Sequence, residues 1–175
     1  FEQRNDVTAE EYLEMIRLKT AVLLAASLKI GARLGGASVE DADRLYDFGM
    51  HIGVAFQLKD DLLDVYGNAK VFGKNIGGDI LCNKKTYMLI KALEHANADQ
   101  HNQLNSWINA ETFQPAEKIA AVTELYDRIG VKAVCENKIL EYSNRAMESL
   151  AAVSIAEEKK EELKKIIENL IHREV

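Results

Sequence analysis

The chain has 175 residues, of which 47% are hydrophobic and 29% are charged. This composition excludes a disordered tail or a low-complexity spacer, because it supplies enough apolar side chains for a sizeable core. The formal net charge of -6 argues against a nucleic-acid-binding protein, which would be basic overall. The two cysteines, Cys82 and Cys135, are too few for a disulfide framework and lack the spacing of a zinc site, so we expect a reducing, cytoplasmic location.

The first residues are charged, and no apolar segment of the kind found in signal peptides follows them. The most apolar stretch, Ala21 to Leu28, ends at Lys29. It is much shorter than the roughly 20 residues that a membrane-spanning helix needs. We therefore expect neither a signal peptide nor a membrane span.

Apolar residues recur at spacings of three and four along most of the chain, and Pro115 is the only proline. This spacing is typical of amphipathic helices, and no alternating segment bounded by turn residues indicates a strand. The prediction is an all-α protein, a helical bundle. We find no internal repeat and no linker, so residues 1–175 are expected to form a single all-α segment.

The first predicted helix begins at Thr8, which is followed three residues later by Glu11 in a capping-box pattern. It extends to about Arg33, where Gly35 and Gly36 interrupt the helical pattern.

A second long helix begins with a similar cap, Ser38 with Asp41, and runs to about Tyr66. The glycine-rich stretch from 67 to 83 has no sustained helical face and is predicted to be a loop. Further helices are expected at about 84–96, 98–110, 115–129, 131–152 and 156–172.

Three carboxylates near the end of the second helix form the most informative motif. On a helix, Asp60 and Asp64 lie one above the other, Gln57 lies a turn earlier on the same side, and Asp61 lies about 100° around the axis. Their mutual repulsion, and their place in the C-terminal half of a helix, would destabilise a bare helix. A divalent cation would reverse that penalty, and Mg²⁺ prefers carboxylate, water and phosphate oxygens.

The alternative is a solvated acidic face, which is the more common explanation of an isolated motif of this kind. The flanking residues argue against it here, because the helix is apolar on either side of the carboxylates. The carboxylates must then line a cavity or pair with other groups. The apolar residues are Leu58, Leu62, Leu63 and Val65.

Two further segments carry positive charge. The loop after the acidic motif contains Lys74 and Lys84 among glycines, and lysines in such loops can bind phosphate as point charges. Lys19 and Thr20 lie in the middle of the first helix, before a strongly apolar continuation. A lysine that only extends along apolar surface toward solvent is the alternative explanation of Lys19.

Taken together, these elements resemble the trans-isoprenyl diphosphate synthases, the polyprenyl synthetase family that includes farnesyl and geranylgeranyl diphosphate synthases. The order and spacing of five separate elements carry the resemblance. They are Lys19-Thr20 with Gly31-Ala32, Phe56-Gln57 with Asp60-Asp61-Leu62-Leu63-Asp64, Gly67 with Gly73-Lys74, Gly77-Gly78-Asp79-Ile80, and Lys84-Lys85-Thr86-Tyr87.

The resemblance implies a Mg²⁺-dependent enzyme that condenses an allylic diphosphate with isopentenyl diphosphate. Asp60, Asp61 and Asp64 match the second aspartate-rich motif of the family, which holds the metal: the resemblance implies that Asp60 is a direct ligand and that Asp61 and Asp64 act directly or through water. The remaining matches divide into two groups: Lys19, Lys74 and Lys84 match the lysines that hold the allylic diphosphate, and Thr20 and Gln57 match the polar groups beside the reacting carbon.

Members of the family are about twice this long and are commonly homodimers, and their first aspartate-rich motif lies upstream of the equivalent of Lys19. No second motif of that kind occurs in this sequence. The chain therefore resembles the C-terminal half of such an enzyme, and we expect it to be inactive alone. Two alternatives are a non-catalytic regulatory subunit of a prenyl synthase and a related terpenoid cyclase; the carboxylates and the lysine loop favour the chain-elongating enzyme.

Overall fold

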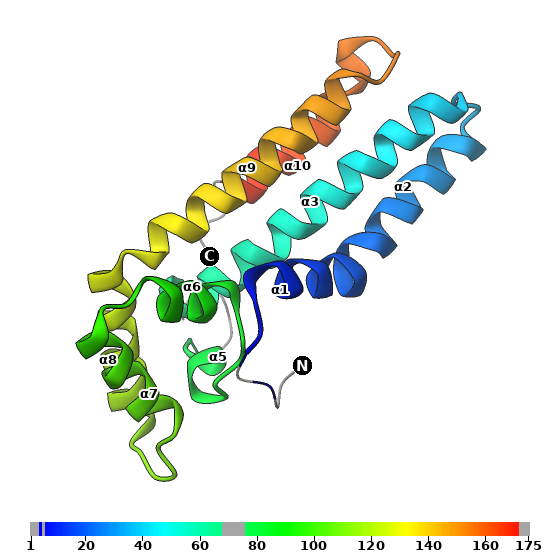
Figure 1. The fold of residues 1–175 in the computed structure, drawn as a ribbon. Helices are drawn as coiled ribbons and strands as arrows, with labels where there is room; N and C mark the ends of the chain where they lie inside the picture. The colour runs from blue at the N-terminus through cyan, green and yellow to red at the C-terminus, as the bar shows by residue number, and fades with distance from the viewer. Residues whose placement is uncertain (1–3, 5, 68–75, 172–175) are drawn as a thin grey trace. The chain divides into compact units, whose positions relative to one another are not determined.

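The computed structural model describes residues 4, 6–67 and 76–171 of the chain, and all regular secondary structure among these residues is helical. The predicted all-α class is confirmed. The helices are α1 (Ala9–Ile16), the π-helix η1 (Arg17–Ala21), α2 (Val22–Leu34), α3 (Val39–Tyr66), α5 (Gly78–Leu81), α6 (Tyr87–His95), α7 (Ala98–Ile108), α8 (Pro115–Ile129), α9 (Val131–Ala151), the 3₁₀-helix η2 (Glu157–Lys159) and α10 (Glu161–Ile171) (Figure 1).

The first predicted helix is present as α1, η1 and α2 in direct succession. Its capping box is formed as expected: the Thr8 amide donates to Glu11 Oε2 at 3.0 Å, and the Glu11 amide donates to Thr8 Oγ1 at 3.2 Å. The sequence did not predict η1, in which the Val22 amide bonds to the Arg17 carbonyl five residues back. π-Helical turns inside α-helices occur frequently at functional sites, and this one contains Lys19 and Thr20.

The second predicted helix is α3, and its end at Tyr66 is as expected. The predicted cap is only half formed: the Asp41 amide donates to Ser38 Oγ at 3.0 Å, but the Asp41 carboxylate binds Arg44 and the amide of Ser154. The aspartate side chain is one methylene shorter than the glutamate of a capping box, and these two partners occupy its Oδ1.

The stretch predicted as a loop from 67 to 83 contains a short helix, which corrects that prediction within its described part. Gly77 has a φ of +83°, and α5 follows it as a single turn. One turn is too short to produce a helical periodicity, so the sequence pattern could not reveal it. Residues 68–75 lie outside the described part of the chain.

The later helices agree with the predictions to within about three residues at most of their ends. The exception is the last one, which was expected from about residue 156: the 3₁₀-helix η2 comes first, and α10 begins only at Glu161. Pro115 occupies the first turn of α8, and Gly130, with a φ of +83°, ends that helix. Both positions follow the known preferences of proline and glycine at helix ends.

Contacts between residues divide the chain into two compact units. The first contains described residues of 1–12 and 60–136, and the second contains those of 13–59 and 137–173. The helices α1, α3 and α9 each contribute residues to both units.

In the second unit, α3 runs beside η1 and α2 at very short range (Figure 1). A Cβ atom on Gly53 would lie 2.6 Å from the Cα of Ala21, and one on Gly49 would lie 2.7 Å from the Cα of Ala25. Glycine on one helix and alanine on the other therefore set the helix spacing. Residues of greater size could not be accommodated without separating the helices.

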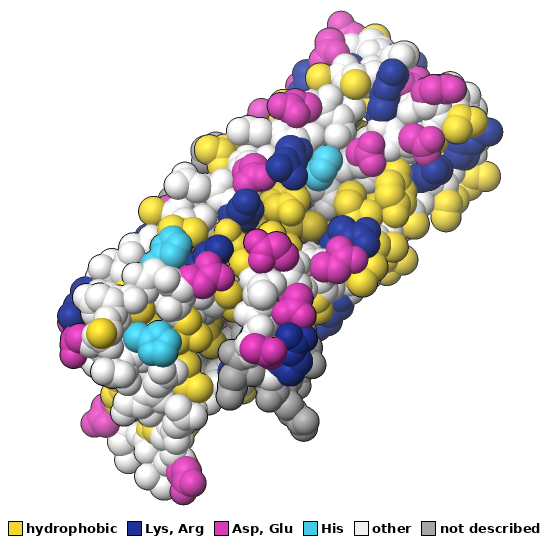
Figure 2. Space-filling model, viewed as in Figure 1, with side chains coloured by type: hydrophobic (Ala, Val, Ile, Leu, Met, Phe, Trp, Pro, Cys, Tyr) yellow, Lys and Arg dark blue, Asp and Glu magenta, His cyan; other side chains and the backbone are white. Residues whose placement is uncertain are grey.

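The other side of α2 is exposed and apolar. Leu23 and Leu34 are 74% and 84% exposed, and Leu24 and Ile30 are also exposed. Figure 2 shows hydrophobic side chains gathered over this helix. None of the helices in the described part of the chain is both long and apolar enough to cross a membrane.

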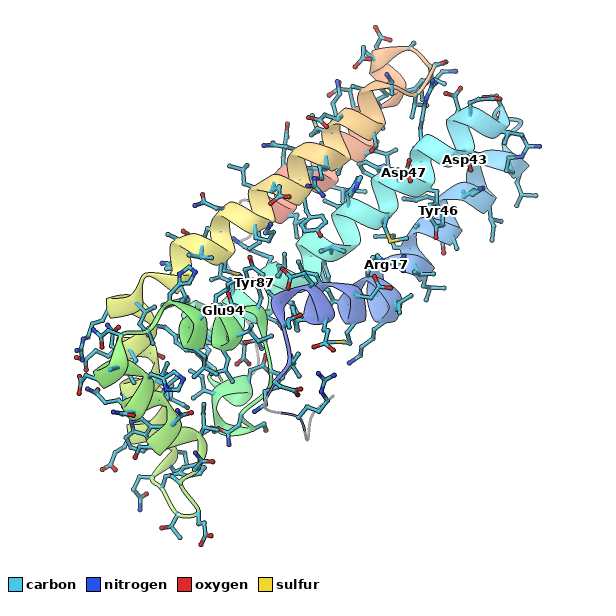
Figure 3. The ribbon with its side chains drawn as sticks, in the orientation of Figure 1. Arg17, Asp43, Tyr46, Asp47, Tyr87 and Glu94 are labelled. Atoms are coloured by element: carbon cyan, nitrogen blue, oxygen red, sulfur yellow. The ribbon has the colours of Figure 1, made fainter. Side chains whose placement is uncertain are left out.

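Where α3 faces α2, Asp43 and Tyr46 project between the two helices (Figure 3). The Lys29 ammonium forms an ion pair with Asp43 and lies 5.6 Å from the centroid of the Tyr46 ring. Polar contacts thus accompany the close glycine–alanine packing of this helix pair.

Candidate active site

The carboxylates of Asp60, Asp61 and Asp64 lie on the last two turns of α3, within the first unit. Their environments differ: Asp61 is buried, with 1% of its side chain exposed, whereas Asp60 and Asp64 are partly exposed. The flanking Leu58 and Leu62 are buried, as the apolar flanks predicted. One carboxylate therefore faces the interior, and two face partly toward solvent.

Asp61 has two partners that hold its two oxygens. The Tyr12 hydroxyl donates a hydrogen bond to Oδ2, and Lys84 Nζ lies 3.1 Å from Oδ1. Burial raises the pKa of Asp61, while Lys84 and Tyr12 partly oppose that effect by stabilising the carboxylate. Burial and the neighbouring carboxylate raise the pKa of Tyr12, so its hydroxyl remains a proton donor.

Lys84 joins the helix to the glycine-rich loop. Besides Asp61, its ammonium binds Asp79 Oδ2 at 2.7 Å. Burial alone would lower the pKa of Lys84, but the two carboxylates outweigh burial and raise it. Lys84 is therefore a fixed positive charge between two acidic groups, with 41% of its side chain exposed.

Asp64 holds α5 in place against α3. Its Oδ2 accepts the amide of Asp79 at 2.8 Å, and its backbone carbonyl accepts the amide of Gly77 at 2.6 Å. Burial raises the pKa of Asp64, and the hydrogen bond from Asp79 opposes this. A Cβ on Gly77 would lie 2.7 Å from Ile119, and φ is +83° at this position, so both packing and backbone require glycine.

Within the described residues, no three aspartate, glutamate, histidine or cysteine side chains gather closely enough to form a metal site on their own. Mg²⁺ is usually held by one or two carboxylates, with water and substrate phosphates completing its octahedral shell. Asp60 and Asp64 lie on successive turns of α3 and are both partly exposed, so their carboxylate oxygens could bind Mg²⁺ in this way. The two oxygens of the buried Asp61 accept hydrogen bonds from Tyr12 and Lys84.

A second group of predicted residues belongs to the second unit. The Thr20 hydroxyl donates to Gln57 Oε1 at 3.3 Å, which joins η1 to α3. Lys19, beside Thr20, is exposed and forms no ion pair with any described residue. Lys74, the remaining predicted residue, lies outside the described part of the chain.

Sequence reasoning missed two residues of this site. The sequence pattern gave Tyr12 no role in the site, although a buried tyrosine hydroxyl usually needs a partner. Asp79 was noted within its motif but was given no role. The partner of Tyr12 lies 49 residues away in the chain, and the partners of Asp79 lie 5 and 15 residues away. Only the folded structure brings these groups together.

The structure thus joins carboxylates that can hold a hard cation to an ammonium that can bind phosphate, on an all-helical scaffold. The polyprenyl synthetase family model matches residues 1–126. The chain belongs to the polyprenyl synthetase family.

The similarity to individual relatives extends along nearly the whole chain. The short chain isoprenyl diphosphate synthase of Methanothermobacter thermautotrophicus is 37% identical over 174 residues, which are 99% of this chain and 52% of the relative. A crystal structure of a geranylgeranyl pyrophosphate synthase matches 100% of this chain and 54% of its own, with a TM-score of 0.92 and 36% identity. The chain spans about half the length of the relatives it matches.

A third relative was crystallised with ligands. The geranylgeranyl pyrophosphate synthase of Corynebacterium glutamicum, in complex with isoprenyl diphosphate and magnesium, matches 95% of this chain and 47% of its own. The TM-score is 0.85 and the identity is 30%.

Proposed function

We propose that this chain is part of a Mg²⁺-dependent prenyltransferase, which condenses an allylic diphosphate with isopentenyl diphosphate. The chain provides the second aspartate-rich motif of the enzyme and the lysines that bind the allylic diphosphate. The observation that carries the proposal is the bridge made by Lys84 between Asp61 and Asp79, directly beside Asp60 and Asp64. The magnesium and isoprenyl diphosphate bound by the Corynebacterium relative support this assignment.

In this proposal Asp60 is the direct ligand of Mg²⁺, and Asp64 binds it directly or through water. When bound there, the metal would neutralise the negative charge that develops on the departing diphosphate. Asp61 differs from both, because its contacts with Tyr12 and Lys84 favour a role in holding the lysine, with any metal contact made through water.

The lysines act on the diphosphate itself. Lys19, Lys74 and Lys84 bind the diphosphate of the allylic substrate, and their charge stabilises it as the carbon–oxygen bond breaks. The double bond of isopentenyl diphosphate then forms the new carbon–carbon bond, and the departing diphosphate accepts the proton that is lost. No separate protein base is required.

Thr20 and Gln57 act on the other product of bond cleavage, the allylic cation. Their side-chain oxygens are joined by a hydrogen bond, which fixes the direction of both dipoles. Oxygen dipoles aimed at a developing positive charge stabilise it electrostatically, and apolar surroundings keep water away from it.

Prenyl transfer tests the proposal directly. We expect no transfer by this chain alone, because it spans about half of its relatives. Fusion to the upstream half of the Methanothermobacter synthase is expected to restore transfer, and Asp60→Asn in the fusion should abolish it. Transfer by the unfused chain would contradict the expected inactivity, and an inactive fusion that is folded would contradict the assignment.

The regulatory-subunit alternative makes a different prediction in the same assay. A non-catalytic subunit would change the rate of an intact prenyl synthase added to it, and Asp60→Asn would leave that effect unaltered. A terpenoid cyclase would instead release a cyclic hydrocarbon from the allylic diphosphate without consuming isopentenyl diphosphate.

We also propose that the protein associates as a homodimer through α2. Its exposed side chains, among them Leu23, Ile30 and Leu34, form an apolar surface of the kind that marks protein interfaces. Sedimentation equilibrium is expected to give twice the mass of the chain, and a monomer at all concentrations would contradict this.

A further inference from the structure

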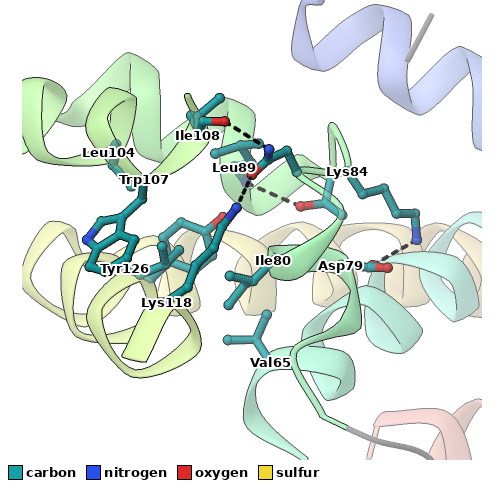
Figure 4. Close-up of a pocket in the computed structure, with 13 residues that line it drawn as sticks. Val65, Asp79, Ile80, Lys84, Leu89, Leu104, Trp107, Ile108, Lys118 and Tyr126 are labelled. Carbon is teal, nitrogen blue, oxygen red and sulfur yellow. Dashed lines mark hydrogen bonds and ion pairs between the residues drawn. The ribbon is translucent and has the colours of Figure 1, made fainter. Parts of the chain in front are cut away.

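A buried lysine lies outside the proposed site. Lys118, on α8, is 1% exposed, and its ammonium donates to Asn83 Oδ1 at 2.7 Å (Figure 4). The same ammonium lies 4.3 Å from the centroid of the Phe113 ring. Among the described residues no carboxylate forms an ion pair with Lys118.

Such an arrangement is costly if its only purpose is packing. Removing an ammonium from water is unfavourable unless partners compensate it, and burial lowers the pKa of Lys118. The neighbouring cavity of about 20 Å³ has room for about one water molecule. A methionine would fill the same space without that cost, so the charged group needs another explanation.

Asn83, the partner of Lys118, has an unusual backbone. Its φ of +50° is the only positive value among the described non-glycine residues. Its side chain uses both of its polar atoms: Oδ1 accepts from Lys118, and Nδ2 donates to the carbonyl of Ile108 at 2.9 Å. These two bonds join the segment after α5 to α7 and α8, and they stabilise a conformation that asparagine otherwise adopts at a cost.

Asn83 directly precedes Lys84. Beyond Asn83 the backbone is fixed again, because the Lys84 amide donates to the Asp79 carbonyl at 2.9 Å and the Lys84 carbonyl accepts from the Thr86 amide at 2.8 Å. The conformation of Asn83 therefore sets the direction in which the Lys84 side chain leaves the backbone, toward Asp61 and Asp79.

We infer that Lys118 is a positioning residue: through Asn83, its buried ammonium holds the backbone that directs Lys84 toward the carboxylates and the diphosphate. The inference rests on the proposed function in one respect, because it takes Lys84 to be a ligand of the diphosphate. The described partners of Lys118 are Asn83 and the Phe113 ring, not the carboxylates of α3.

The first measurement follows Lys84 without any ligand. In a chain labelled with ¹³C and ¹⁵N lysine, the Lys84 signals are assigned from their loss in Lys84→Arg. Lys118→Met keeps the apolar stem and removes the charge, and it should shift the ε-methylene signal of Lys84 toward that of a lysine that forms no ion pair, because Lys84 would lose its contacts with Asp61 and Asp79. Asn83→Gly permits the same φ but removes both side-chain bonds, so it should produce the same shift.

Lys160→Met is the matched control. Lys160 is also a buried lysine, 2% exposed, but it binds the Ala151 carbonyl and Glu157 in the other unit. This variant should lower stability and leave the Lys84 signals in place. Unchanged Lys84 signals in folded Lys118→Met and Asn83→Gly would overturn the inference.

The second measurement is titration with inorganic diphosphate in the presence of Mg²⁺. Lys118→Met should weaken binding about tenfold, within the range of coupling found between residues that share a network. In a Lys84→Ala background the same substitution should produce no further loss. A purely structural role would weaken binding equally in both backgrounds and would overturn the inference.

The two measurements separate this inference from the proposed function. If the unaltered chain does not bind diphosphate but Lys118→Met still moves the Lys84 signals, the positioning role holds and the diphosphate-binding role is lost. If diphosphate binds normally to Lys118→Met, the positioning role is lost and the proposed function stands.

Discussion

At the scale of single residues, Gly53 determines how closely α3 approaches η1. A Cβ there would lie 2.6 Å from the Cα and 2.7 Å from the Cβ of Ala21. Because the obstacle includes backbone, Gly53→Ala is expected to reduce the free energy of unfolding by about 2 kcal/mol. Urea denaturation measures this loss.

Gly31→Ala is the matched control for that substitution. No atom lies within 4 Å of the position that its Cβ would occupy, and the residue is exposed within α2. Here alanine should raise the free energy of unfolding by about 0.5 kcal/mol, because it restricts the unfolded chain. Equal effects at both glycines would contradict the packing argument.

His51 gives the stability a pH dependence. It is half-buried, with Ser149 Oγ 3.5 Å from its Nδ1 and the Tyr142 ring 6.2 Å away between centroids. Burial lowers the pKa of His51 below its usual 6.5, so the unfolded chain binds its proton more readily than the folded chain. Stability should therefore fall as the pH drops below about 6.5.

Comparing urea denaturation at pH 7.5 and 5.5 tests this sign. The unaltered chain should lose more stability over this interval than His51→Gln does. The same substitution at the exposed His95 should preserve the pH dependence of the unaltered chain. A His51→Gln variant with the full pH dependence would show that another group is responsible.

The sequence predicted the carboxylates of α3 and Lys84 as site residues, because their type and spacing are local. It did not predict the contacts that Tyr12 and Asp79 make in the site, or the hydrogen bond from Lys118 to Asn83. Each of those depends on a partner brought near by folding, and the side chains concerned are a tyrosine, an aspartate and a lysine that would be ordinary in other surroundings.

At the scale of helices, local caps explain why the predicted boundaries agree so well with the structure. The α7 helix has a complete capping box: Asn97 Oδ1 accepts the Gln100 amide, and Gln100 Oε1 accepts the Asn97 amide, both at 2.9 Å. Asn97→Ala should lower the free energy of unfolding by about 1 kcal/mol.

The same substitution inside α7 serves as a control. Asn102 is exposed in the middle of the helix, so Asn102→Ala should raise stability by a few tenths of a kcal/mol through helix propensity. Urea denaturation of both variants measures the two changes in the free energy of unfolding. A loss at Asn102 as large as that at Asn97 would contradict the capping argument.

Two elements, α5 and η1, could not be predicted from the sequence pattern. The turn α5 is held by hydrogen bonds to Asp64, and η1 differs from an α-helix only in the register of its backbone bonds. Neither feature changes the spacing of apolar residues, which is the signal that revealed the long helices.

At the scale of the whole molecule, the residues that we propose for the site are divided between the two compact units, and the chain spans only about half the length of its relatives. The carboxylates and Lys84 lie in one unit, and Thr20 and Gln57 lie in the other. We therefore propose that catalysis needs the remaining half and that diphosphate binding is the property to test first.

Calorimetric titration of inorganic diphosphate into this chain, with and without Mg²⁺, tests the central claim most directly. Asp60→Asn is the test variant, and Asp47→Asn is the control, since Asp47 is exposed on the same helix but far from the motif in sequence. We predict binding that requires Mg²⁺, is weakened at least about tenfold by Asp60→Asn and is unaffected by Asp47→Asn. Binding that ignores the metal and Asp60, or no binding under either condition, would contradict the proposed diphosphate and metal site.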